Sequence, residues 1–310
     1  MSAEPKTFRL VTRSDFDGLV TAVLLKKLNL IDDILFVHPK DVQDGVVEIT
    51  SRDITTNLPY NEQCHLAIDH HLSESVRVDS ARPNFVNNPT APSAARVVFT
   101  HFGGEATFGD QFDEMLAAVD QADSAQYSAE EIFSPTRWTL LNFLTDPRTG
   151  LGRFREFRIS NYQLMMALVD HLATKSIDEI LELPDVKERS EIYFAHNDRF
   201  QAQLKNCTMV NGKVALLDLR NEEVIHPGNR FALYVLFPDC HTSIHVLWGK
   251  QKQNVILAVG KSITNRTSNA DIGTLLLKYG GGGHANAGTC QVGVDQVDTT
   301  LEEILSHLNE

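Results

Sequence analysis

Strand and helix patterns alternate in the first third of this chain. Short apolar runs at residues 8–12, 34–37, 46–49 and 65–68 predict strands, and residues 19–28 predict an amphipathic helix. This alternation is typical of a mainly parallel sheet with helices on both faces. Ligands of such sheets bind beyond the carboxyl ends of the strands, so polar residues just after a strand are candidate site residues.

Acidic and imidazole side chains follow these predicted strands. They are Asp15, Asp17, Asp53 and the triplet Asp69-His70-His71. Charges at the ends of buried strands cost free energy, and a divalent metal ion is the usual compensation. Carboxylate and imidazole ligands together favour Mn²⁺ or Fe²⁺ over Ca²⁺. An acidic turn that caps the following helix is the alternative for Asp15 and Asp17.

The remaining chain predicts a helical segment and then a second set of strands. Residues 91–205 are mostly helical, while strands are predicted at 214–217, 231–236, 243–247, 255–259 and 288–292. Helices are expected at 271–279 and 299–308. We therefore expect a first domain at residues 1–185, a linking helix at 186–206 and a smaller α/β domain at 207–310.

Two further segments carry candidate site residues. Asp123 lies at the end of a predicted helix, where a solvated helix terminus explains it equally well. Four glycines at 280–283 precede His284, and their backbone N–H groups could approach an anion closely. Arg266, upstream in a polar loop, could bind phosphate oxygens or simply be solvated.

Composition restricts the partners of the chain. The formal net charge of −13 argues against binding to long nucleic acid, which depends on clustered Lys and Arg. No apolar run approaches the ~20 residues that span a bilayer, and the first residues lack a signal-peptide pattern. The four widely spaced cysteines predict neither a zinc site nor a disulfide framework. We expect a cytoplasmic protein.

These motifs together resemble the DHH/DHHA1 phosphoesterase family. Residues 15–18 are similar to its first motif, Asp53 to the second, residues 69–71 to the third and residues 123–127 to the fourth. The glycine run with His284 is similar to the signature of the DHHA1 domain. The resemblance implies a two-domain hydrolase that binds one or two Mn²⁺ ions, with Mg²⁺ or Fe²⁺ as alternatives, and holds its substrate between the domains.

The resemblance also implies a role for each matching residue. The implied metal ligands are Asp15, Asp17, Asp53, His70 and Asp123. His71 would lie near the phosphate and Asp69 would support the ligand set, and these two are the implied catalytic residues. The residues implied to hold the substrate are Arg266, Gly282, Gly283 and His284.

Arg13 departs from the family pattern, which has a His or Asp ligand just before the first Asp pair. A guanidinium cannot ligate a cation. Either one metal position is weakened or lost, or Arg13 turns to a phosphate or a carboxylate.

The predicted activity is metal-dependent hydrolysis of phosphoester bonds in short nucleotides. Candidate substrates are short oligoribonucleotides, linear dinucleotides and 3′-phosphoadenosine phosphate, with no long duplex and no membrane as partner, and a homodimer is left open. One alternative is a hydrolase of phosphoanhydrides such as polyphosphate or pyrophosphate. Another is a nucleotide-binding sensor in which Arg13 has impaired the metal site.

Overall fold

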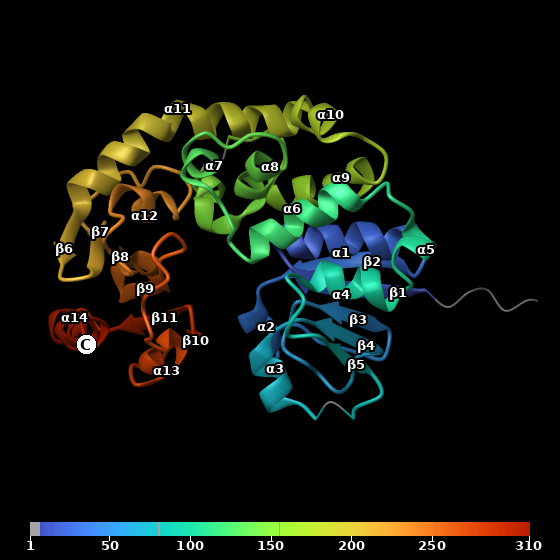
Figure 1. Cartoon of the computed structure of the whole chain (residues 1–310), viewed down its shortest axis with the longest axis horizontal. Coiled ribbons are helices and arrows are strands. Elements are labelled where there is room, and N and C mark those ends of the chain that lie inside the picture. Colours follow the sequence, from blue (N-terminus) through green and yellow to red (C-terminus); the bar gives the residue numbers. More distant parts are fainter. Residues whose placement is uncertain (1–6, 80, 155) are drawn as a thin grey trace, which may run out of the picture. The chain divides into compact units, whose positions relative to one another are not determined.

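The computed structural model describes residues 7–79, 81–154 and 156–310, and these residues divide into two compact units (Figure 1). The first unit comprises residues 7–127 and 135–192, and the second comprises Ser128–Ser134 and Tyr193–Glu310. The predicted α/β class is confirmed, because each unit has its own sheet and helices. Residues 1–6, on which the absence of a signal pattern partly depends, lie outside the described ranges. Within those ranges, no helix has the length and apolar character needed to cross a membrane.

The first unit is built on a five-stranded parallel sheet. Its strand order is β2-β1-β3-β4-β5, which places a topological switch point between β1 and β3. The carboxyl ends of all five strands meet at one edge of this sheet. The strands are β1 (Phe8–Arg13), β2 (Ile31–Val37), β3 (Asp53–Thr56), β4 (Leu66–Asp69) and β5 (Phe85–Asn87).

Helices cover both faces of this sheet. Helix α1 (Phe16–Lys27) is almost wholly buried because it packs against β1, β2 and α4 (Ala94–His101). A separate apolar cluster lies near α2 (Pro39–Gln43) and α3 (Leu72–Arg77). The other helical elements of the unit are α5 (Glu105–Phe108), α6 (Asp113–Asp123), α8 (Arg137–Thr145), η1 (Pro147–Thr149), η2 (Leu151–Arg153), α9 (Asn161–Leu172) and α10 (Ile177–Leu181).

The predicted strand at residues 46–49 is wrong. The Val46 and Val47 amides donate to Asp41 O at 2.9 and 3.2 Å, which folds this segment back onto the end of α2. Val46 is also 74% exposed. The real third strand begins later, at Asp53, so Asp53 opens a strand instead of following one.

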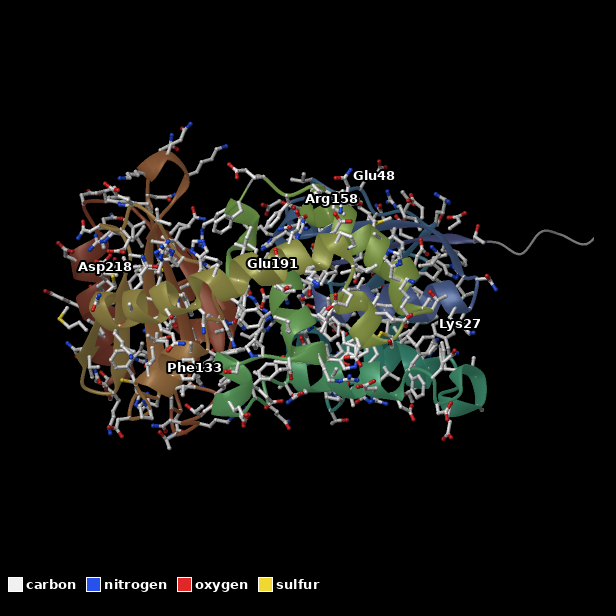
Figure 2. All side chains as sticks on the ribbon, turned by 90° about the horizontal axis from the view of Figure 1, so that it is seen from above. Lys27, Glu48, Phe133, Arg158, Glu191 and Asp218 are labelled. Atoms are coloured by element: carbon white, nitrogen blue, oxygen red, sulfur yellow. The ribbon has the colours of Figure 1, made fainter. Side chains whose placement is uncertain are left out.

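The second unit has a mixed sheet with the order β10-β11-β9-β8-β7-β6. Helices α13 (Ile272–Leu277) and α14 (Val297–Leu308) contribute to its apolar core. Asp218, labelled in Figure 2, ends β7 and binds Arg220, with 2.6 Å between Oδ2 and Nη2. The strands are β6 (Thr208–Asn211), β7 (Val214–Asp218), β8 (Thr242–Trp248), β9 (Val255–Lys261), β10 (Gly282–His284) and β11 (Ala287–Val292).

Helix α11 (Pro184–Cys207) crosses the boundary between the units. The short helix α7 (Ala129–Phe133) belongs to the second unit although its sequence neighbours belong to the first, and nothing in the sequence indicated this. A short 3-10 turn, η3 (Lys250–Lys252), lies between β8 and β9.

The predicted strand at 231–236 is also wrong, because this segment forms helix α12 (Ala232–Leu236). Asn229 starts the turn: its Oδ1 accepts from the Phe231 amide at 3.0 Å, and its carbonyl accepts from the Ala232 amide at 3.0 Å. The Tyr234 hydroxyl then pairs with Ser243 Oγ at 2.8 Å. Aromatic and β-branched residues favour strands only weakly, and this local and tertiary bonding overrides the preference.

Candidate metal centre

Two aspartates lie where β1 turns into α1, and helix N-termini hold them in place. Asp15 caps α1, since its Oδ1 accepts from the Gly18 amide at 3.0 Å. Asp17 accepts from Ala94 N at 3.0 Å and Ala95 N at 2.8 Å, which are the first amides of α4. Orphan amides and the helix dipole both favour a negative charge at such positions.

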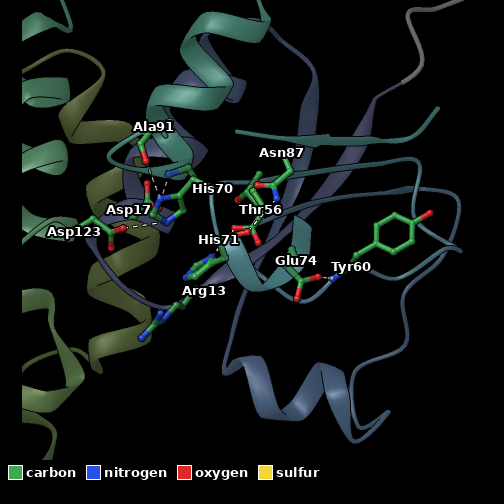
Figure 3. Close-up of polar contacts among 12 residues, drawn as sticks. Arg13, Asp17, Thr56, Tyr60, His70, His71, Glu74, Asn87, Ala91 and Asp123 are labelled. Carbon is green, nitrogen blue, oxygen red and sulfur yellow. Dashed lines mark hydrogen bonds and ion pairs between the residues drawn. The ribbon is translucent and has the colours of Figure 1, made fainter. Parts of the chain in front are cut away.

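The polar triplet begins at Asp69, the last residue of β4, and its two imidazoles bind different partners. His70 Nδ1 lies 3.3 Å from Ala91 O, and a carbonyl only accepts, so Nδ1 carries the hydrogen. His70 Nε2 then points to Asp123, 3.0 Å from its Oδ2 (Figure 3). His71 Nδ1 lies 2.8 Å from Asp69 Oδ1. The two imidazoles thus have different partners, although both lie at the carboxyl edge of the sheet.

Asp123 is the last residue of α6, and a neighbouring ion pair fixes that helix against α4. Arg96 donates to Asp120 Oδ2 through Nε at 2.9 Å and Nη2 at 2.6 Å. As a result, potential ligand atoms of Asp17, His70 and Asp123 lie within 4.8 Å of one another. Figure 3 shows these three side chains directed toward one point.

Burial and mutual charge perturb the pKa values of this cluster. Burial, with added repulsion from Asp123, raises the pKa of Asp17 to about 7. For His70 burial acts in the opposite direction, but the contact with Asp123 prevails and raises the pKa to about 9. Burial likewise raises the pKa of Asp15. Without a cation, the cluster therefore retains protons near neutral pH.

The residues of this cluster fit a divalent metal ion. His70 Nε2 has no hydrogen bond of standard geometry within the described residues, although Asp123 is near. The Nδ1 contact to Ala91 fixes the tautomer that leaves Nε2 available as a ligand. Two carboxylates and one imidazole are a ligand set suited to Mn²⁺ or Fe²⁺.

Asp53 lies at the opposite, amino end of the sheet. It pairs in register with Arg9, the second residue of β1, whereas Thr12 pairs with Thr56 at the carboxyl end. Its Oδ1 accepts from Arg9 Nε at 2.7 Å, and its Oδ2 accepts from Thr50 N at 2.7 Å. The expectation that Asp53 joins the metal ligands is therefore corrected, because the strand before it was misassigned and its oxygens bind other donors.

Asn57, which the sequence reasoning missed, occupies the carboxyl end of β3 instead. Its amide N–H donates to Ile68 O at 3.2 Å, and the residue is only 2% exposed. Neither polar atom of its side chain has a hydrogen-bond partner among the described residues. A polar residue directly after Ile54-Thr55-Thr56 was the available signal, but the two threonines made that run look unlike a buried strand.

Arg13 turns to a carboxylate. Its Nε lies 2.8 Å from Asp15 Oδ2, which is the carboxylate contact among the alternatives that the sequence left open. Asp15 is accordingly not part of the group formed by Asp17, His70 and Asp123.

The four residues expected to hold substrate all lie in the second unit. Gly282, Gly283 and His284 form β10, while Arg266 lies between β9 and α13 and donates from Nε to Ile263 O at 3.1 Å. Close packing explains part of the glycine run: a Cβ on Gly283 would lie 2.3 Å from Ala287 O, and its φ is +152°. The substrate-binding roles of these residues stay predictions.

Comparison with solved structures identifies similar proteins. A pGpG-specific phosphodiesterase, PggH from Vibrio cholerae, is 56% identical, with 98% of this chain and 99% of that chain covered and a TM-score of 0.83. CDC45 from Entamoeba histolytica is 9% identical over 98% of this chain and 96% of that chain, with a TM-score of 0.52, and shares the fold alone. No protein-family model and no curated protein matches the chain.

Proposed function

Because the chain belongs to the DHH family of phosphoesterases, we propose that it is a metal-dependent phosphodiesterase that hydrolyses linear dinucleotides such as pGpG. The observation that carries this proposal is the full-length similarity to PggH at 56% identity. The clustering of Asp17, His70 and Asp123 at the carboxyl edge of the parallel sheet supports it independently.

The proposed metal ligands are already oriented by the fold. The amides of Ala94 and Ala95 hold both oxygens of Asp17, and Ala91 O sets the ring of His70. A bound divalent ion would polarise the phosphoryl oxygens and lower the pKa of a coordinated water. Asp123, in the last turn of α6, is the third proposed metal ligand.

His71 and Asp69 form the proposed proton-donating pair. Burial opposes the charged imidazole and lowers the pKa of His71, but the hydrogen bond that His71 donates to Asp69 outweighs burial and raises this pKa. His71 thereby holds a proton that Nε2 can give to a leaving oxygen. Water adds its oxygen to the bridging phosphorus and releases a proton to the solvent. The bond from phosphorus to the 3′ oxygen breaks, and that oxygen takes the proton from His71. For pGpG both products are GMP.

The remaining details of the proposal follow from chemistry and from the family. Mn²⁺ is the proposed ion, since carboxylate and imidazole ligands suit it. The proposed location is the cytoplasm, because the four cysteines are all free thiols, as a reducing compartment keeps them. Arg266 and His284 are proposed to hold the far end of the substrate, with short oligoribonucleotides attacked from one end in the manner of an exonuclease.

Turnover of three substrates tests the proposal. The full chain with added Mn²⁺ is incubated with pGpG, with a nucleoside 3′,5′-bisphosphate and with polyphosphate, and the products are separated by chromatography. We expect GMP from pGpG to form fastest. Faster phosphate release from polyphosphate would contradict the proposal in favour of a phosphoanhydride hydrolase. Tight nucleotide binding with no hydrolysis of any substrate would contradict it in favour of a sensor.

A further inference from the structure

Arg13 blocks one side of Asp15. The two oxygens of Asp15 are already engaged, Oδ1 by Gly18 N at 3.0 Å and Oδ2 by Arg13 Nε at 2.8 Å. The Asp15 side chain is 11% exposed and that of Arg13 is 31% exposed, so solvent screens the pair only in part. A cation at Asp15 Oδ2 would have to displace the guanidinium and remain close to its positive charge.

Asn57 removes a negative charge from the same edge. Thr56 pairs with Thr12 in register, so Asn57 follows β3 at the level where Arg13 ends β1. Its buried side-chain amide has no hydrogen-bond partner among the described residues, and it adds no charge to the edge. A carboxylate at this position would supply a charged ligand, which an amide does not.

The ligand groups at this edge share one imidazole. Asp17, His70 and Asp123 form one group of potential ligands, and Asp69, His70 and His71 form a second group that contains the same His70. His70 Nδ1 is engaged by Ala91 O, so only Nε2 is available, and one nitrogen lone pair binds one ion. A cation placed at Asp15 instead would lie beside the positive charge of Arg13 in a largely buried place.

We infer that this centre binds a single divalent metal ion, at Asp17, His70 and Asp123, and that Arg13 takes the place of a second ion. The inference rests on the proposed function for its substrate. The remaining N–H groups of Arg13 then bind phosphoryl oxygens of the dinucleotide, a contact for which a planar guanidinium is well suited. Arg13 thus stabilises the negative charge of the phosphoryl oxygens, which a second metal ion would otherwise do.

Metal stoichiometry and the electron paramagnetic resonance spectrum of Mn²⁺ test the inference without use of activity. The full chain is titrated with Mn²⁺ by calorimetry, and the spectrum is recorded at saturation. We expect one ion per chain and the six-line spectrum of an isolated Mn²⁺. Two ions per chain with a spin-coupled spectrum would overturn the inference.

Variants test whether Arg13 and Asn57 determine the number of bound metal ions. The double variant R13H/N57D offers an imidazole and a carboxylate, and we expect it to bind a second, spin-coupled Mn²⁺. R13K keeps the positive charge and should stay at one ion while its KM for pGpG rises. The matched control R52H alters an exposed arginine that pairs with Asp32 near the amino end of the sheet, and it should stay at one ion.

The outcomes separate this inference from the proposed function. If R13H/N57D melts like wild type and still binds one ion, the role given to Arg13 and Asn57 is overturned. If the wild-type chain binds one Mn²⁺ but does not hydrolyse pGpG, the proposed function fails and the single-metal inference stands. Hydrolysis of pGpG with two bound ions would overturn the inference alone.

Discussion

The two ends of the parallel sheet hold acidic side chains in opposite ways. At the amino end, the carboxylate of Asp53 accepts four hydrogen bonds, two each from Arg9 and Thr50. Burial opposes its charge, but Arg9 prevails and lowers the pKa of Asp53. At the carboxyl end, Asp17 and Asp123 crowd one imidazole, and the pKa of Asp17 is raised to about 7. A saturated carboxylate supports the fold, whereas crowded carboxylates form a site that a cation stabilises.

Replacing a member of the crowded cluster has the largest expected effect. His70→Ala removes the imidazole ligand, and turnover of pGpG should fall by at least ~100-fold, since loss of outer-shell partners alone costs 10- to 100-fold. Mn²⁺ binding measured by calorimetry should fall with it. The circular dichroism spectrum serves as the folding control. A folded His70→Ala protein with wild-type turnover would remove His70 from the metal centre.

Replacing the saturated carboxylate should affect stability instead. Asp53→Asn leaves the Arg9 guanidinium without its counter-charge, so the free energy of unfolding should fall by about 2 kcal/mol, reduced from the fully buried case because Arg9 is 25% exposed. Urea denaturation measures this loss. Metal stoichiometry should not change, and a loss of metal binding in the folded variant would place Asp53 back among the ligands.

The two ends should also respond to pH in different ranges. The folded pKa of His70, about 9, lies above the usual value of 6.5, so its contribution to metal-free stability is full below 6.5 and is lost as pH rises through about 9. For Asp17 the folded pKa of about 7 lies above 3.8, so stability falls as pH rises between these values. Asp53, with a lowered pKa, contributes stability above 3.8 and loses it only as pH falls below that value.

The affinity for Mn²⁺ should also depend on pH, because the cluster at the carboxyl end holds protons. Mn²⁺ must displace protons from the crowded cluster, so its affinity should increase as pH rises through about 7 toward 9. Calorimetry in buffers with different ionisation enthalpies measures the protons released. Equal affinity across this range, with no proton release, would show that the cluster is not the metal centre.

The smallest effect is expected at an exposed pair near the amino end. Arg52 Nη2 lies 2.6 Å from Asp32 Oδ1, but the two side chains are 53% and 42% exposed. Arg52→Ala should therefore change the free energy of unfolding by ~0.5 kcal/mol or less. A loss as large as that of Asp53→Asn would show that exposure does not separate these two pairs.

The sequence predicted the fold class because strand and helix periods are local signals. The alternation at residues 8–68 indicated the parallel sheet, and membership of the DHH family is confirmed by the similarity to PggH. The predicted hydrolysis of phosphoester bonds in short nucleotides agrees with the activity of PggH. Asp15, Asp17 and the triplet were placed correctly after strands. Their mutual distances depend on how α4 and α6 pack, and no local pattern contains that information.

The errors came from segments in which tertiary bonding overrides local preference. Residues 46–49 are apolar enough for a strand but fold back onto Asp41, which shifted the third strand and moved Asp53 to the wrong end. Asn57 was missed because the polar residues Thr55 and Thr56 made the preceding segment look unlike a buried strand. In the structure Thr56 is buried, and its hydroxyl donates to Thr12 Oγ1 at 2.7 Å. The hydrogen bond that satisfies the Thr56 hydroxyl joins residues 44 positions apart, so no local sequence pattern contains it.

Mn²⁺-dependent turnover of pGpG by wild type, Asp123→Asn and Asp53→Asn, measured under identical conditions, locates the metal centre at one end of the sheet. We expect Asp53→Asn to retain the wild-type rate at a temperature at which it is folded, and Asp123→Asn to lose at least ~100-fold. Retained turnover in Asp123→Asn together with lost turnover in folded Asp53→Asn would contradict a metal centre at the carboxyl end.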